Sequence, residues 1–125
     1  MRILLDTNVL LWALAGSPRI RQVSGLILGA DTEVYVSTAS WWEVAVKASA
    51  GKIDADVQVL RAAAADSGFL ELPVYGVHVE ALARLPMLHH DPFDRMIVAQ
   101  AMAEPMRLLT GDGQLAAYTD LVQKI

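Results

Sequence analysis

The sequence predicts an α/β fold in which helices cover both faces of a central parallel sheet. Short apolar runs of strand length alternate along the chain with longer stretches that are rich in Ala and Leu. Strands that alternate with helices form β-α units, and the parallel sheets built from them are buried on both faces. The chain has 125 residues, of which 54% are hydrophobic, so we expect a single domain with a substantial core over 1–125.

The expected strands are short runs of Ile, Leu, Val and aromatic residues that end at polar or turn-forming residues. In chain order they lie at 3–5, 34–37, 69–72, 107–110 and 121–123. The expected helices fill the stretches between them. Gly16, Gly29 and Gly51 mark the ends of the first three helices, and Pro73 marks the end of the third strand. The helices lie at 9–15, 19–28, 41–49, 57–66, 77–85, 94–103 and 113–118.

Charge, cysteine content and hydropathy exclude several classes of protein. The net charge of −4 argues against a generally basic nucleic-acid binder, and the absence of Cys excludes disulfide frameworks, thiolate zinc sites and a Cys nucleophile. Residues 1–16 look like a short signal peptide, but Asp6, Thr7 and Asn8 interrupt the apolar segment that such a peptide needs. No apolar run approaches the roughly 18 residues of a membrane span. We therefore expect a cytoplasmic protein with no membrane contact.

Four acidic residues occupy equivalent places beside the expected strand ends. Asp6 directly follows the first strand, and Asp112 follows the fourth. Glu43 is expected in the first turn of the helix after the second strand, and Asp94 in the first turn of the helix that follows a D-P dipeptide. In open α/β sheets the functional crevice lies beyond the carboxyl ends of the strands, which is where these side chains are expected.

Each of these acids, taken alone, also has a simple structural explanation. Asp6 and Asp112 are suited to cap the helices that follow them. The sequence from Ser40 to Glu43 matches a capping box, S-x-x-E. The segment 91–94 supplies a cap, then Pro at the first helical position, then an acid in the first turn. Capping therefore stays open as an interpretation of any single member.

The joint pattern favours a metal site. If the strands are neighbours, the four carboxylates converge, and uncompensated carboxylates 4 Å apart repel by about 4 kcal/mol per pair at an effective dielectric constant of 20. A divalent cation is the usual compensation. Carboxylate ligands without Cys favour a hard ion, Mg²⁺ or Mn²⁺. Such ions activate water and hold phosphoryl oxygens, so the pattern predicts metal-assisted attack on a phosphate ester.

Four segments in order carry a resemblance to a known family. They read MRILLDTNVL at 1–10, SWWEVAVK at 40–47, HDPFDRMIVAQA at 90–101 and LTGD at 109–112. Together they resemble the PIN domain, and more closely a VapC-type toxin ribonuclease of the subgroup that carries D-P-F-D-R. The resemblance implies a three-layer α/β/α sandwich and an endoribonuclease dependent on Mg²⁺ or Mn²⁺. It also implies RNA as the substrate, a homodimer and a cognate antitoxin. The metal-binding acids it implies are Asp6, Glu43, Asp94 and Asp112.

The resemblance also suggests supporting roles. Thr110 matches a hydroxyl position that orients a carboxylate or a water, and Asn8 stands close enough to Asp6 to hydrogen-bond to a ligand. Asp91 lies three residues before Asp94, so it is expected to cap the helix while Asp94 binds metal. Arg95 is expected to contact a substrate phosphate or to pair with Asp91.

Other basic and aromatic residues are assigned more loosely. Lys47 forms an i,i+4 pair with Glu43 and is also a candidate for an RNA path, together with Arg19, Arg21, Lys52 and Arg95. One of the adjacent residues Trp41 and Trp42 is expected to be exposed on a dimer or antitoxin surface, because neighbours on a helix point about 100° apart.

The histidines invite a zinc interpretation. His89 and His90 are adjacent, and adjacent loop residues rarely reach one metal. A surface-loop or capping role is expected for them, and His78 is expected on a helix face.

Three alternatives compete with the nuclease interpretation. A haloacid-dehalogenase-like phosphatase needs a second Asp where this chain has Asn8. A receiver-like signalling domain needs an Asp at the end of a middle strand and a suitably placed Lys, whereas the middle strand here ends at Glu71-Leu72 and Lys124 comes too late. A PIN-like module that binds RNA or protein without cleaving it remains open, and the intact set of acids argues against it.

Overall fold

The computed structural model describes all residues 1–125, and its centre is a sheet of five parallel strands. Every strand pair is parallel, in the order β3-β2-β1-β4-β5. The predicted α/β class is therefore confirmed. A receiver-like domain has the order 2-1-3-4-5, so this sheet excludes it. The strands are β1 (Arg2–Leu5), β2 (Glu33–Ser37), β3 (Leu70–Leu72), β4 (Arg107–Thr110) and β5 (Val122–Lys124).

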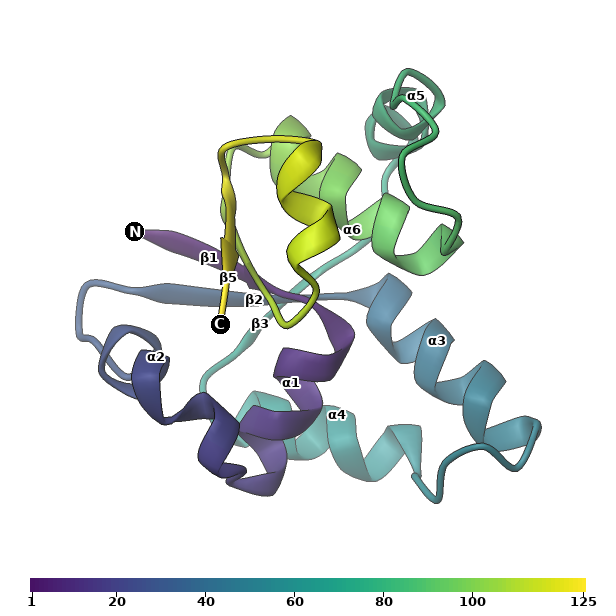
Figure 1. Cartoon of the computed structure of the whole chain (residues 1–125). Coiled ribbons are helices and arrows are strands. Elements are labelled where there is room, and N and C mark those ends of the chain that lie inside the picture. The colour runs from purple at the N-terminus through teal and green to yellow at the C-terminus, as the bar shows by residue number, and fades with distance from the viewer.

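Helices lie on both sides of this sheet (Figure 1). Helices α1, α2 and α4 cover one face, α6 and the 3-10 helix η2 cover the other, and α5 packs against α6. None of the helices combines the length and apolar character that crossing a membrane requires. The helices are α1 (Thr7–Ala15), α2 (Arg21–Ile27), α3 (Thr38–Ser49), α4 (Val57–Asp66), α5 (Gly76–Ala83) and α6 (Pro92–Ala103), with 3-10 helices η1 (Pro18–Ile20) and η2 (Gly113–Ala117).

The central strand supplies both cores, because successive side chains of a strand point to opposite faces. Ile3 and Leu5 pack into the cluster beneath α1 and α2, whereas Leu4 packs with Leu108 and Ile97 of α6 on the other side. All five side chains are completely buried. A strand covered on both faces reads as a continuous apolar run, which explains why the I-L-L sequence predicted it.

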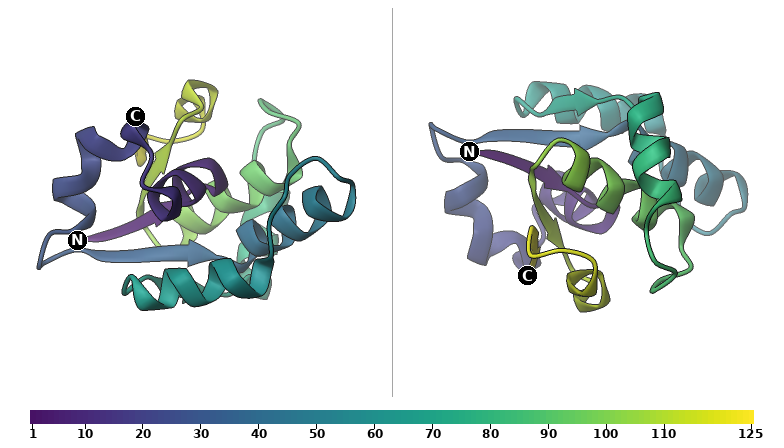
Figure 2. Two further views of the ribbon diagram at one scale, coloured as in Figure 1. Left: turned by 90° about the horizontal axis from the view of Figure 1, so that it is seen from below. Right: turned by 90° about the horizontal axis from the view of Figure 1, so that it is seen from above.

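The strand register brings the carboxyl ends of the central strands to one edge. Leu5, the last residue of β1, pairs with Val36 on one side and with Leu109 on the other. Both β1 and β2 run toward α3, which extends beyond the sheet (Figure 2). The chain leaving β1, β2 and β4 therefore enters α1, α3 and η2 at this same edge.

The start of α3 differs from the sequence-based expectation. The helix begins at Thr38, directly after β2. Ser37, the last residue of β2, is its N-cap, because the Ser37 hydroxyl accepts a hydrogen bond from the Ala39 N–H at 3.0 Å. The expected capping box is therefore wrong: Ser40 lies inside the helix and its hydroxyl accepts a hydrogen bond from Thr7. Glu43 consequently lies in the second turn of α3 rather than the first.

Candidate active site

Asp6 sits where β1 passes into α1, and both of its carboxylate oxygens are hydrogen-bonded. Its backbone N–H donates to the Leu109 carbonyl at 3.0 Å, so the residue still follows the register of the sheet. One side-chain oxygen accepts the Val9 N–H at 2.8 Å and caps α1. The other accepts a hydrogen bond from the Thr110 hydroxyl. Asp6 thus acts as a helix cap and as a carboxylate that β4 holds in place.

Glu43 projects from α3, and its side chain is only 5% exposed. Lys47, one turn later, donates to its Oε2 at 2.7 Å. This hydrogen bond is the main reason that the pKa of Lys47 is raised. The other carboxylate oxygen, Oε1, is buried and has no hydrogen-bond partner. A buried oxygen without a partner carries a desolvation cost that a ligand can remove.

Asp91 and Asp94 divide the roles that the D-P-F-D segment offers. One oxygen of Asp91 accepts the Phe93 and Asp94 N–H groups at 2.9 and 3.1 Å, so Asp91 is the N-cap of α6. Asp94 lies in the first turn with no direct hydrogen bond to its carboxylate. Burial, together with the charges of nearby acids, raises the pKa of Asp94 to about 7. The acids that contribute are Asp91, Asp6 and Glu43.

Asp112, two residues after the end of β4, completes the group. Its Oδ1 accepts the Gln114 N–H at 2.9 Å and caps η2, while its own N–H donates to the Thr110 hydroxyl at 2.9 Å. Its Oδ2 lies 3.0 Å from Nε2 of His89. One ligand atom each from His89, Asp94 and Asp112 lie within 4.8 Å of one another. Sequence reasoning placed His89 on a surface loop and missed this contact, because nothing local distinguishes it from its exposed neighbour His90.

The four acids share one electrostatic environment. The pKa of Asp6 is raised, mainly by burial: the hydrogen bonds from Thr110 and Val9 lower it, and the charges of Glu43 and Asp112 raise it further. The charges of Asp6 and Glu43 in turn contribute to the raised pKa of Asp94. The charges of the predicted acids thus act on one another, while the ligand atoms that lie within 4.8 Å of one another are those of Asp94, Asp112 and His89. The donor set consists of carboxylate oxygens, one of them buried and free, and it fits a hard divalent cation.

Some of the expected supporting residues do not face this group. Asn8 is exposed and makes no side-chain hydrogen bond. Arg95 forms no ion pair with Asp91 or with the other acids: its guanidinium donates to the Leu85 carbonyl at 3.3 Å, and its Nε is buried without a partner. His78 is completely buried between α5 and α6, where Nε2 lies 2.7 Å from Glu104.

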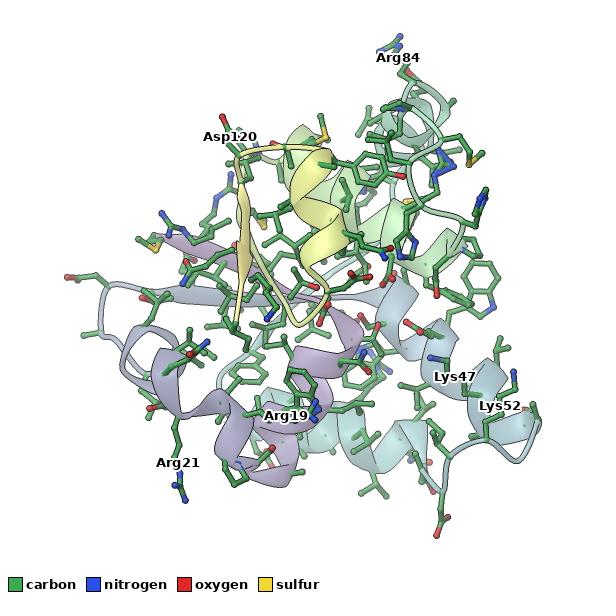
Figure 3. All side chains as sticks on the ribbon, in the orientation of Figure 1. Arg19, Arg21, Lys47, Lys52, Arg84 and Asp120 are labelled. Carbon is green, nitrogen blue, oxygen red and sulfur yellow. The ribbon has the colours of Figure 1, made fainter.

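The basic residues proposed for an RNA path do not form one continuous strip. Lys47 extends from α3 toward Glu43, whereas Lys52 lies in the turn beyond the end of this helix and Arg21 projects from α2 into solvent (Figure 3). Arg19 is held over the Trp12 ring, 4.8 Å from its centroid. Only Lys47 therefore brings a positive charge directly to the acids.

The turn that carries Thr110 and Asp112 packs closely on α1. A Cβ at Gly111 would lie 2.6 Å from the Trp12 ring, so the turn approaches α1 more closely than any side chain allows. We expect Gly111→Ala to lower the free energy of unfolding by about 1–3 kcal/mol, measured by urea denaturation, because the ring must move in a packed region. Gly113→Ala is the matched control, since its Cβ would meet only Lys124 at 3.7 Å. An equal loss in both variants would contradict this explanation.

The sequence was compared with models of known protein families. The profile of the PIN domain matches residues 3–121. The chain belongs to the PIN-domain family. No curated protein sequence matches it significantly. Membership confirms the family that the four sequence segments suggested.

Solved structures share the fold of this PIN domain. VapBC2 from Rickettsia felis, bound to a DNA fragment from its promoter, gives a TM-score of 0.76 at 16% identity, covering 99% of this chain and 98% of that one. A toxin–antitoxin complex from Klebsiella pneumoniae gives 0.69 at 22% identity, covering 98% and 99%. VapC20 from Mycobacterium tuberculosis, a toxin that cleaves the sarcin–ricin loop, gives 0.58 at 19% identity, covering 94% and 97%. At these identities the similarity shows a common architecture.

Proposed function

We propose that this PIN domain is a metal-dependent endoribonuclease and the toxin of a type II toxin–antitoxin pair. The observation that carries the proposal is the buried, unpartnered Oε1 of Glu43, together with the carboxyls of Asp6 and Asp94, whose pKa values are raised. Such a group is electrostatically costly without a cation. Family membership and the toxins among its structural relatives support the same conclusion.

Asp6, Glu43, Asp94 and Asp112 are the residues that would hold Mg²⁺ or Mn²⁺. The bound ion would supply an activated water and a contact for phosphoryl oxygens. The protein contributes orientation: Thr110 donates to Asp6, Lys47 to Glu43, and the first turn of η2 to Asp112. These contacts hold three carboxylates before any substrate arrives, and such outer contacts commonly tune a metal site. Lys47 also supplies a positive charge at the rim, where the RNA backbone would pass.

The partners proposed are RNA, a cognate antitoxin and a second copy of the chain, and the proposed location is the cytoplasm. One exposed surface supports a protein partner. Trp42 is 63% exposed, and its ring packs edge-on against Phe93, with ring centroids 4.9 Å apart. Exposed Val46 extends this apolar surface along α3, on the helix that carries Glu43. Trp is enriched at protein interfaces, so a bound antitoxin segment would lie next to the acids.

The test is RNA cleavage by purified, partner-free protein. We expect discrete fragments from total RNA in Mg²⁺ or Mn²⁺, and no fragments in EDTA, because the metal contributes several kcal/mol of transition-state stabilisation. Restoring Mn²⁺ after chelation should restore cleavage. Folded wild-type protein that cuts no RNA in either metal would contradict the proposal and favour a PIN module that only binds.

A further inference from the structure

His89 lies among the acids although no supporting role has been assigned to it. It precedes α6 on the loop that follows α5, and its side chain is 16% exposed. Its Nε2 lies 3.0 Å from Asp112 and 3.9 Å from Asp94. Its other ring nitrogen, Nδ1, accepts the backbone N–H of Asp91 at 3.1 Å. Both ring nitrogens therefore have fixed neighbours.

These neighbours determine where the imidazole proton resides. A backbone N–H can only donate, so Nδ1 must carry the free lone pair that accepts the Asp91 hydrogen. In the neutral ring the proton is then on Nε2, which donates to the carboxylate of Asp112. A metal-ligating nitrogen has to be unprotonated. Ligation through Nε2 would place the proton on Nδ1, facing the Asp91 N–H. The contacts therefore make His89 a hydrogen-bond donor rather than a ligand.

The loop is held in place from the same side as Asp112. The Tyr118 hydroxyl accepts the His89 N–H at 2.8 Å and the Leu88 N–H at 3.2 Å. Tyr118 directly follows η2, the helix that Asp112 caps. A closed set of contacts thus runs from Asp112 through η2 to Tyr118, on to His89, and back to Asp112. The loop and the carboxylate cannot shift independently.

We infer that His89 is a positioning residue that orients the Asp112 carboxylate through its Nε2–H, and that Tyr118 holds His89 in register for this contact. The inference rests on the proposed function in one respect, since orientation of Asp112 matters for metal binding. Asp112 then resembles Asp6 and Glu43, each of which has one oxygen held by a side-chain donor. Asp94 alone among the four has no close donor and remains free to adjust.

Two substitutions separate the functions of the two ring nitrogens. The Gln amide nitrogen reaches about as far along the side chain as Nε2, so His89→Gln keeps the donor to Asp112. His89→Asn keeps only a group at the position of Nδ1. His90→Asn is the matched control, because His90 is exposed and forms no side-chain hydrogen bond. Tyr118→Phe removes the hydroxyl while keeping the ring.

The first measurement uses metal-free protein and needs no activity. A long-range ¹H–¹⁵N spectrum of the imidazoles, recorded at a pH where the ring is neutral, should show the His89 proton on Nε2. The ¹³C resonance of the Asp112 carboxyl should move in His89→Asn and Tyr118→Phe, and should stay close to its wild-type position in His89→Gln and His90→Asn. A proton on Nδ1, or an Asp112 resonance that ignores His89→Asn, would overturn the inference whatever the protein does to RNA.

The second measurement is Mn²⁺ affinity by isothermal titration calorimetry. His89→Asn and Tyr118→Phe should weaken binding by about 10- to 100-fold, the range found when contacts to metal ligands are removed. His89→Gln should stay within a few-fold of wild type. An equal loss in His89→Gln and His89→Asn would identify His89 as a ligand and reject the positioning role. Failure of wild-type protein to cleave RNA would count against the proposed function, while the spectra would still decide the role of His89.

Discussion

Asp6→Asn and Asp94→Asn should each abolish RNA cleavage while leaving the fold intact. Each substitution removes one negative charge from the proposed metal site and keeps the side-chain shape. Asn caps helices as well as Asp, so the bond from the Val9 N–H to residue 6 is retained. Loss of several kcal/mol of metal-derived stabilisation corresponds to a rate decrease of more than about 100-fold. The measurement is the initial cleavage rate in Mn²⁺, with circular dichroism to confirm folding.

Two further variants make this result specific. Asp120 is exposed and lies far from the site, so Asp120→Asn controls for the change in net charge and should cleave at the wild-type rate (Figure 3). Asp91→Asn should lose less than about 10-fold, since Asn keeps the cap of α6. Cleavage that survives in both Asp6→Asn and Asp94→Asn would reject the metal-site assignment. A larger loss in Asp91→Asn than in Asp94→Asn would exchange their roles.

Metal-free protein should be less stable at pH 8 than at pH 5. The pKa of Asp94 is raised from 3.8 to about 7, so the folded state holds its proton more tightly than the unfolded state. Asp94 therefore does not affect the free energy of unfolding below pH 3.8. It lowers this free energy as the pH rises from 3.8 to about 7, and above that pH the carboxyl is ionised in both the folded and the unfolded state. The full shift corresponds to about 4 kcal/mol, and solvent screening of the partly exposed carboxyl reduces it to about 2 kcal/mol. The raised pKa of Asp6 acts in the same direction.

Urea denaturation in EDTA at the two pH values measures this effect. Asp94→Asn cannot ionise, so it should be more stable than wild type at pH 8 by about 2 kcal/mol and should show a flatter pH profile. Saturating Mn²⁺ at pH 8 should restore wild-type stability and leave Asp94→Asn almost unchanged. Wild-type stability that increases from pH 5 to pH 8 without metal would contradict the electrostatic account of the site.

The parts of the fold that local patterns determine were predicted well. Buried parallel strands appear as short apolar runs, and the sequence located β1 and β4 on that signal alone. The start of α3 was misplaced because Ser37 and Ser40 are both acceptable caps by sequence. The choice between them depends on where β2 stops pairing, which the sheet decides.

The same division holds for the candidate site. Asp6 and Asp112 could be placed because the carboxyl ends of parallel strands share an edge. The contact of Arg95 could not be predicted, because its guanidinium donates to the carbonyl of Leu85, which lies in the loop between α5 and α6. His89 was missed for a similar reason: its position depends on Tyr118, which lies 29 residues further along the chain. Contacts between loops leave no periodic pattern to detect.

The hydrogen bond between Thr110 and Asp6 joins residues 104 positions apart. In a chain that has been synthesised only as far as β3, Asp6 has neither its hydroxyl donor nor Asp112 beside it, because both residues come later in the sequence. Contacts of such long range form late, because a large loop must close first. A nascent chain with the proposed ribonuclease activity would therefore leave the RNA of the ribosome that makes it uncut until Thr110 and Asp112 have emerged.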